Sequence, residues 1–279
     1  MKKKMLFAAA MSAVCAFGLT ACGDGKQADF KFTPSVEGSY YLCTATGDEE
    51  ATVAVVPSEY KGKPVTTLGY GAFYACKNLK SVTIPSSIDF IDAWSFGACE
   101  SLTELTIPDS VVTVGMFVFC QCTNLKSVTL SKNLTSISRG MFYQCGKIES
   151  ITFPDGVTHI GIDAFAACSS LKNVTLPEGL TSIGASAFYG CNSFTDITLP
   201  DSITSVNIGL FDSCENLKSV TLGGGVDSID MYAFRGCLSL TDINFKGTKE
   251  QWNKMKKGLD WNENTGDYTV HCTDGDISK

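Results

Sequence analysis

The amino-acid sequence predicts an α/β-poor repeat solenoid, a β-solenoid of eight 23-residue repeats with N- and C-terminal caps. Three columns of residues recur at this interval without insertion or deletion, as expected for stacked copies of one small unit. One column is a triplet such as Val82-Thr83-Ile84, whose alternation is typical of a short strand with one buried face. The other two columns are phenylalanine (Phe73, Phe96, Phe119, Phe142, Phe165, Phe188, Phe211, Phe234) and, three residues later, cysteine (Cys76, Cys99, Cys122, Cys145, Cys168, Cys191, Cys214, Cys237).

Two further segments complete each coil. An apolar pair three residues apart, such as Val111 and Val114, predicts a bent second strand or an extended turn. The segment around each Phe and Cys predicts a turn or short helix that carries the ring inward. Burial of the apolar side chains of one coil contributes on the order of 10 kcal/mol, which is less than the entropy cost of ordering about twenty residues. We therefore expect the coils to be stable only as a cooperative stack.

The chain divides into five segments. We expect a lipoprotein signal peptide over residues 1–21, a tether over 22–38, an N-terminal β cap over 39–68, the solenoid over 69–246 and a C-terminal cap over 247–279.

The caps are expected because an uncovered end of a strand stack would pair with other molecules. Two alternating segments, Tyr40–Thr44 and Thr52–Val56, predict strands in the N-terminal cap. In the C-terminal cap, the spacing of Trp252 and Met255 predicts a helix within residues 249–259, and residues 268–272 predict a closing strand.

The first 22 residues predict export. Three lysines precede an apolar run, Met5–Leu19, that is too short and too rich in Ala and Ser for a good membrane span. The run ends in Leu19-Thr20-Ala21-Cys22, which is similar to the lipobox of bacterial lipoproteins and predicts lipid attachment at Cys22. The alternative is an ordinary signal peptide that ends near a cysteine. We expect an exported bacterial lipoprotein of the cell envelope that contacts the membrane through its N-terminal lipid only, with the membrane face left open.

The charge of the chain argues against nucleic acid as a partner. The formal net charge is −7, and removal of Lys2, Lys3 and Lys4 with the signal peptide lowers it to −10. Nucleic-acid binding requires basic surface that displaces counterions. The same charge gives no help in docking onto anionic lipid.

The cysteine column predicts buried thiols rather than disulfides. Residues stacked in one column point the same way at about 4.8 Å, whereas a disulfide needs Cβ atoms about 3.8 Å apart with converging bonds. The column is therefore interpreted as small apolar fillers. A metal-binding column is the alternative, but no histidine or carboxylate accompanies it, and we expect no metal. Pairing of Cys43, Cys120 and Cys272 is left open.

The repeat resembles the BspA-like leucine-rich repeat of bacterial surface proteins. The pattern Ala-Phe-x-x-Cys-x-x-Leu-x-x-Val-x-Ile-Pro begins here at Ala72, and the flanking segments 60–65 and 247–252 are also similar to those of the family. The resemblance covers roughly residues 40–275. It implies a leucine-rich-repeat solenoid, and it implies a role in adhesion, host-protein binding or contact between bacteria.

Catalytic chemistry is not predicted. The two histidines, His159 and His271, lack partners at metal-ligand spacing, and His159 occupies a solvent-facing column otherwise filled by Thr, Ser and Phe. No phosphate-binding loop, nucleophile elbow or zinc spacing is present in the sequence. We expect no enzyme activity and no cofactor.

Two surfaces are candidates for binding. The strand face predicts a hydroxyl-rich ribbon, which is interpreted either as a recognition face or as a consequence of strand propensity and solubility; its candidate residues are Thr83, Glu104, Thr106, Thr129, Thr152, Thr175, Asp196 and Thr198. An aromatic patch near the first three repeats is the second candidate, because aromatic residues and Met are enriched in interface hot spots. Its residues are Tyr70, Phe90, Trp94, Met116 and Phe117. The alternative is that these side chains fold inward over the core edge or against the N-terminal cap.

The sequence thus predicts a monomeric, non-catalytic envelope protein that recognises a protein or glycan of a host or neighbouring cell. The alternative from another class is a structural or glycan-capturing lipoprotein of the envelope.

Overall fold

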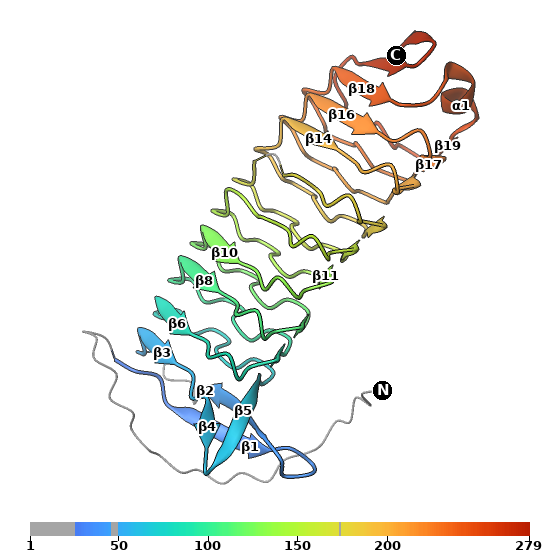
Figure 1. Cartoon of the computed structure of the whole chain (residues 1–279). Helices are drawn as coiled ribbons and strands as arrows, with labels where there is room; N and C mark the ends of the chain where they lie inside the picture. The colour runs from blue at the N-terminus through green and yellow to red at the C-terminus, as the bar shows by residue number, and fades with distance from the viewer. Residues whose placement is uncertain (1–25, 46–49, 173) are drawn as a thin grey trace.

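The chain forms a rod of stacked coils, with its N-terminal cap at one end and its C-terminal cap at the other (Figure 1). The computed structural model describes residues 26–45, 50–172 and 174–279. Their arrangement confirms the predicted β-solenoid. The predicted signal peptide, the lipid-attachment residue Cys22 and the start of the tether lie outside the described residues.

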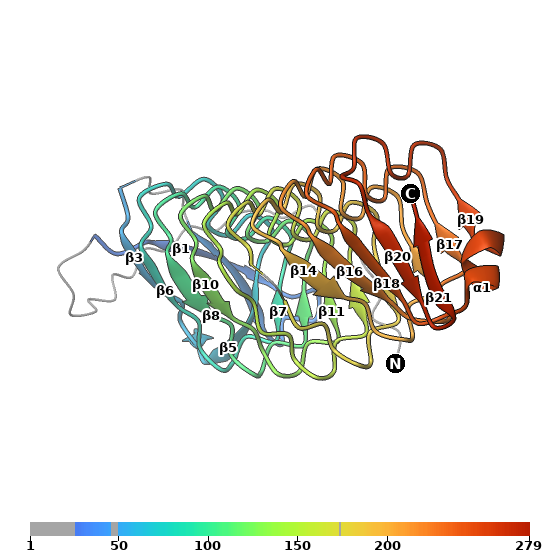
Figure 2. The same cartoon turned by 90° about the horizontal axis from the view of Figure 1, so that it is seen from above.

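One row of strands runs along the rod and forms what we call the strand face (Figure 2). Within this row the paired strands β3–β6, β8–β10 and β14–β16–β18 run parallel at a register of one coil, for example Val128 opposite Leu105 and Ile197 opposite Val220. Residues 151–153 and 174–176 keep the alternation of exposure but form no strand. The row consists of β3 (Val53–Val55), β6 (Ser81–Thr83), β8 (Glu104–Thr106), β10 (Ser127–Thr129), β14 (Asp196–Thr198), β16 (Ser219–Leu222) and β18 (Asp242–Phe245).

A second row of two-residue strands lies where the sequence predicts a bent strand or extended turn. In each of these strands the second residue is buried, and the first faces outward. The row consists of β7 (Phe90–Ile91), β9 (Thr113–Val114), β11 (Ser136–Ile137), β12 (His159–Ile160), β13 (Ser182–Ile183), β15 (Ser205–Val206) and β17 (Ser228–Ile229).

The phenylalanine column forms a continuous stack through the core. All eight rings are fully buried. Successive ring centroids lie 5.2–5.9 Å apart with interplanar angles of 5–18°. Rings from the caps close the stack edge-on: Phe30 packs on Phe73 at one end and Trp261 on Phe234 at the other. The stack therefore joins all coils and both caps into one core.

The cysteine column is buried, as predicted, but its thiols do more than fill space. Each thiol from Cys99 to Cys237 donates a hydrogen bond of 3.0–3.3 Å to the carbonyl oxygen of the phenylalanine in the preceding coil, as Cys145 does to Phe119. No disulfide joins Cys43, Cys120 or Cys272 to another described cysteine. Each of these carbonyl oxygens also accepts a backbone hydrogen bond from the cysteine of its own coil, as Phe119 does from Cys122, so the thiol supplies a second bond that links neighbouring coils.

We expect the native protein to resist thiol-modifying reagents, because only the thiolate reacts and burial disfavours it. Burial raises the pKa of Cys43 and Cys214 to about 12 and that of Cys120 to about 11. Titration with a disulfide-exchange reagent at about pH 8 should label the partly exposed Cys272 first among the described cysteines. The others should react only after unfolding in guanidinium. Rapid labelling of two or more of them in the native protein would contradict this account.

The N-terminal cap begins earlier than the sequence predicts. Strand β1 (Phe30–Pro34) falls within the segment 22–38 expected to be a tether, and it pairs antiparallel with β2 (Tyr41–Ala45). Strand β2 joins β5 (Lys63–Leu68), which also pairs with β4 (Glu59–Tyr60) and leads into β7. The reason is that Phe30 supplies the edge-on ring that closes the core stack.

The C-terminal cap continues the coil geometry. Helix α1 (Lys249–Lys254) begins at a capping box in which Thr248 and Gln251 bond reciprocally. The helix is shorter than predicted because β19 (Lys256–Lys257) pairs with β17. Strand β20 (Thr269–Cys272) confirms the closing strand by pairing with β18, and β21 (Gly275–Ser278) folds back on it as the edge strand.

Candidate interaction surfaces

We call the third side of the rod the turn face. In each coil it is formed by the segment that starts three residues before the core phenylalanine and ends two residues after it. Backbone N–H groups on this side donate to the next coil, as Trp94 does to Met116 at 3.0 Å and Phe96 to Val118 at 2.9 Å. No side chain is needed for these bonds. Side chains at equivalent positions of successive coils therefore form straight rows along the rod.

The position two before each phenylalanine, the inner row, has left-handed backbone in all eight coils, with φ of 55–62°. Such a backbone favours glycine and costs other residues roughly 1–2 kcal/mol. Coils two and three nevertheless carry aromatic residues here. The inner row reads Gly71, Trp94, Phe117, Gly140, Asp163, Ser186, Gly209 and Tyr232.

Four rings on the turn face form a ladder, which we call the aromatic ladder: Tyr74, Trp94, Phe117 and Tyr143. The central pair, Trp94 and Phe117, stacks at 4.9 Å with an interplanar angle of 23°. Tyr74 meets Trp94 edge-on at 5.9 Å, and Tyr143 meets Phe117 edge-on at 6.4 Å. Tyr74 is 54% exposed, and the other three are partly exposed.

Two glycines make room for the ladder. A Cβ at Gly140 would collide with the ring of Phe117, and a Cβ at Gly97 would lie 3.0–3.1 Å from the rings of Tyr74 and Trp94. Ring stacking contributes about 0.5–1.5 kcal/mol per pair, which offsets much of the backbone strain at Trp94 and Phe117. Aromatic residues at these strained positions are thus supported by their neighbours.

One ion pair lies beside the ladder. The guanidinium of Arg139 lies 5.7 Å from the Phe117 ring centroid, and its Nη2 is 3.8 Å from Oδ2 of Asp163. That separation is longer than a hydrogen bond. Burial raises the pKa of Asp163, although the neighbouring Arg139 acts to lower it. The carboxylate is therefore only partly compensated within the chain.

The predicted aromatic patch is divided by the structure. Trp94 and Phe117 are in contact on the turn face, and Tyr70 and Met116 are exposed there by 68% and 51%. The assignment of Phe90 to this patch was wrong. Phe90 lies on β7 in the second strand row, between Thr67 and Thr113, because the next residue of the same strand, Ile91, takes the inward position. The sequence reasoning missed Tyr74 and Tyr143. Both are aromatic residues directly after a core phenylalanine, a position that belongs to the turn face, and this is the signal that could have identified them.

Tyr70 and Met116 belong to an outer row, the position three before each core phenylalanine. Four bulky apolar members, Tyr70, Met116, Ile162 and Ile208, are 44–68% exposed and are separated by smaller or charged residues, whereas Met231 is only partly exposed. The outer row reads Tyr70, Ala93, Met116, Arg139, Ile162, Ala185, Ile208 and Met231.

The predicted ribbon residues lie side by side on the strand face, and all are exposed: Thr83, Glu104, Thr106, Thr129, Thr152, Thr175, Asp196 and Thr198. Thr152 and Thr175 lie in the two coils that form no strand there. The ribbon is therefore a polar surface whose backbone pairing is interrupted in its centre.

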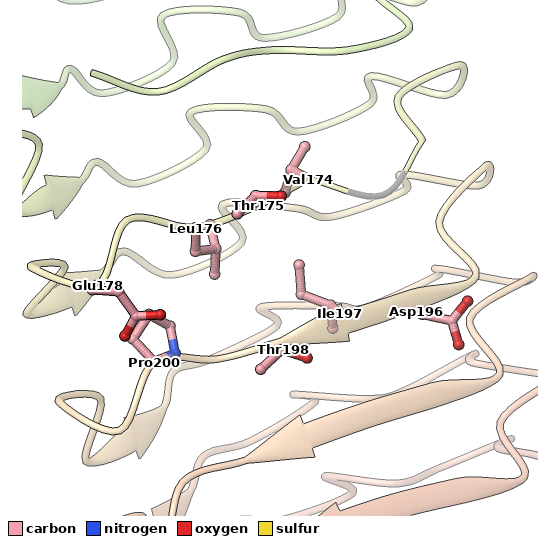
Figure 3. A pocket seen from close by; sticks show the side chains of 8 residues that line it. All are labelled: Val174, Thr175, Leu176, Glu178, Asp196, Ile197, Thr198 and Pro200. Carbon is pink, nitrogen blue, oxygen red and sulfur yellow. The ribbon is translucent and has the colours of Figure 1, made fainter. Parts of the chain in front are cut away.

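A shallow pocket of about 350 Å³ lies at this interruption, between residues 174–178 and 196–200 (Figure 3). Its two ionisable groups are the carboxylates of Glu178 and Asp196, which lie at opposite ends of the pocket (Figure 3). Threonine hydroxyls and aliphatic side chains line the rest. The lining residues include no nucleophile with a neighbouring base.

The two histidines have different surroundings. His159 is exposed on β12, as predicted, and contacts the hydroxyl of Thr158 at 2.6 Å. His271 bridges the last strands: Nε2 lies 2.8 Å from Oδ1 of Asp242 and Nδ1 lies 3.0 Å from Oδ1 of Asp276. Hydrogen bonds to Asp242 and Asp276 raise the pKa of His271, and bonds from Thr241 and His271 lower the pKa of Asp242.

We expect His271 to make the cap more stable in mildly acidic than in alkaline solution. Because the folded-state pKa of His271 is raised, its contribution is complete below the unfolded value of 6.5 and is lost as pH rises through the folded-state value. The lowered pKa of Asp242 sets the acid limit, so the contribution is complete between about pH 4 and 6.5. The melting-temperature difference between wild type and His271→Gln should shrink from pH 6 to pH 9. A constant difference would contradict the charge pairing.

Within residues 26–45, 50–172 and 174–279, no helix combines the length and apolar character needed to cross a membrane. The same residues contain no cluster of three or more His, Cys, Asp or Glu side chains suited to a metal ion.

The stacked coils and two strand rows define a leucine-rich-repeat β-solenoid. A family model described as the BspA type leucine rich repeat region matches in six copies over residues 60–168 and 135–255. This match spans more than half of the chain, and the chain belongs to that family.

Two solved structures are similar to this chain. A leucine-rich repeat protein of T. pallidum is 26% identical with a TM-score of 0.54, over 76% of this chain and 87% of that one. A leucine-rich repeat protein from Bacteroides ovatus ATCC 8483 is 23% identical with a TM-score of 0.60, over 85% of this chain and 70% of that one. The second likeness concerns the fold alone. No curated protein matches the chain.

Proposed function

We propose that this protein is a non-catalytic binding protein of the cell envelope that recognises a protein of a host or neighbouring cell through its turn face. The observation that carries the proposal is the aromatic ladder, where Trp94 and Phe117 stack on strained backbone beside exposed Tyr70, Tyr74 and Met116. Tyr, Trp, Phe, Met and Arg are the residues enriched at protein interfaces. Membership of the BspA type family supports a role at the cell surface.

The distribution of charge also supports the turn face. Its inner and outer rows carry one acidic and one basic residue, Asp163 and Arg139, and these are paired with each other. The net negative charge of the chain therefore lies mostly on other surfaces. A long face with few charges and exposed aromatic residues is typical of an interface with another macromolecule.

Protein is favoured over glycan as the partner by the geometry of the rings. Trp94 and Phe117 stack on each other, and Tyr74 and Tyr143 pack against them at interplanar angles of 78° and 83°. The stacked pair therefore uses one face of Trp94 and one face of Phe117 within the chain, which leaves less flat ring surface on which a sugar could stack. A cluster of packed aromatic residues beside an arginine suits a protein hot spot.

A pull-down with the full chain tests the proposal. We expect Trp94→Ala with Phe117→Ala to weaken partner binding at least about 30-fold, which corresponds to 2 kcal/mol or more for a hot spot. The matched control is Thr106→Ala with Thr129→Ala on the strand face, which should bind like wild type. Equal capture by the ladder variant, with an unchanged circular dichroism spectrum, would refute the proposal. A glycan array, used in parallel, distinguishes sugar binding.

We propose further that acylation of Cys22 anchors the protein, as the lipobox-like segment predicts. Cys22→Ser should release the chain from the membrane fraction. Retention of that variant would contradict acylation, and proteolysis of intact cells would report whether the rod faces outward.

A further inference from the structure

In most coils of the turn face, a large side chain corresponds to a small one when the order of the coils is reversed about the middle of the rod. We number the coils one to eight by their phenylalanines, Phe73 to Phe234. In the outer row the bulky Met116 of coil three corresponds to Ala185 of coil six, and Ile208 of coil seven to Ala93 of coil two. Each pair is related by reversal of the coil order, so that coil k corresponds to coil nine minus k.

The inner row follows the same rule. Trp94 of coil two corresponds to Gly209 of coil seven, and Phe117 of coil three to Ser186 of coil six. The bulky ladder residues thus face, under reversal, positions where the side chain is small or absent. The coils advance by a similar step, 5.2–5.9 Å between successive rings, so the correspondence in sequence is also one in space. The end coils depart from it in the outer row, where Tyr70 of coil one corresponds to Met231 of coil eight and both side chains are large.

The charges of the turn face are complementary under the same operation. Arg139 lies in coil four and Asp163 in coil five, on either side of the centre. Reversal places Arg139 of one copy next to Asp163 of the other, and the reverse contact occurs at the same time. The long intrachain separation of 3.8 Å and the five donors of a guanidinium leave Arg139 able to bind a second carboxylate.

We propose that the turn face joins two copies of this chain in antiparallel orientation about a twofold axis that passes between coils four and five. Such an interface is isologous, so Trp94, Phe117, Met116 and Ile208 of one copy each enter the gap over a small residue of the other. Two reciprocal Arg139–Asp163 pairs lie at its centre. This inference rests on the proposed role of the turn face in protein recognition and names a second copy, on a neighbouring cell, as the protein recognised.

Charge reversal tests the dimer in a way that an intrachain role cannot imitate. The full chain carries Cys22→Ser in every sample, so that no lipid contributes to association. We expect the wild type to sediment as a dimer at concentrations on the order of 10–100 μM, which suits an interface of modest size. Arg139→Asp alone and Asp163→Arg alone should each weaken the dimer by ~100-fold, because like charges then meet at both central contacts.

An equimolar mixture of the two variants is the decisive sample. In a mixed pair one copy is acidic at both positions and the other is basic at both, so opposite charges meet again and dimers should return. If the substitutions acted only within one chain, mixing the two variants would not bring the dimer back. Circular dichroism confirms that each variant is folded.

Three results would overturn the proposal: a wild type that remains monomeric to about 100 μM, single variants that still dimerise, or a mixture that stays monomeric. The outcomes separate the two proposals. A monomeric wild type whose capture of another protein depends on Trp94 and Phe117 removes the dimer and keeps the proposed function.

Discussion

Replacing Phe142 by alanine is expected to lower the free energy of unfolding by about 4 kcal/mol and the melting temperature by roughly 10 °C. The ring is fully buried and stacks on Phe119 at 5.5 Å and on Phe165 at 5.3 Å. Its loss removes contacts to two coils at once and leaves a cavity in the middle of the array. Because neighbouring coils are stable only as a stack, the cavity weakens the whole unit.

Phe90→Ala is the matched control, since it removes the same side chain from a partly exposed position on β7. Its expected cost is below about 1 kcal/mol, in line with a substitution outside the core. Urea denaturation followed by circular dichroism measures both variants. Equal losses for Phe90→Ala and Phe142→Ala would contradict the role given to the ring stack.

Replacing Arg235 by alanine is expected to cost about 3 kcal/mol, because it leaves the carboxylate of Asp212 buried without its cation. Asp212 is 4% exposed, and Arg235 binds it through both Nε and Nη2, with Nε 3.3 Å from Oδ1. The guanidinium also lies 4.1 Å from the ring centroid of Tyr232. The pair therefore links coils seven and eight at the surface of the core.

Removal of both partners should be less harmful than removal of Arg235 alone. Coil five has Ala166 where coil seven has Asp212, so an alanine fits this position. We expect the double variant Asp212→Ala with Arg235→Ala to recover most of the stability lost in the single variant. Additive losses in a double-mutant cycle would show that Asp212 is not the group left uncompensated.

The repeat architecture could be predicted from the sequence because every coil repeats the same inward residues. The fixed spacing of Phe142 and Phe165 placed their rings in one column, and the alternation at Val128 and Ile197 placed the strands. The cap was harder. Phe30 lies in a polar, irregular segment without a repeat, and its role depends on the end of a stack that exists only after folding.

The candidate site was only partly predictable. Trp94 and Phe117 are identified by aromatic character at a position where five of the other six coils carry glycine, aspartate or serine and coil eight carries Tyr232. Phe90 was assigned to the same patch because it is close in sequence, but strand alternation at Ile91 directs it to another face. Tyr74 and Tyr143 joined the ladder through contacts between coils, with partners 20 and 26 residues away in the chain.

The sequence by itself determined the coil, its period and its buried columns, since these follow from local spacing repeated eight times. Only the tertiary structure decided which surface side chains meet, because contacts between coils depend on the direction in which the left-handed turn residues aim them. It also decided that the thiols of the cysteine column bond to phenylalanine carbonyls. Neither property follows from hydrophobic pattern, because a pattern specifies which residues are buried and leaves the partners of their polar atoms undefined.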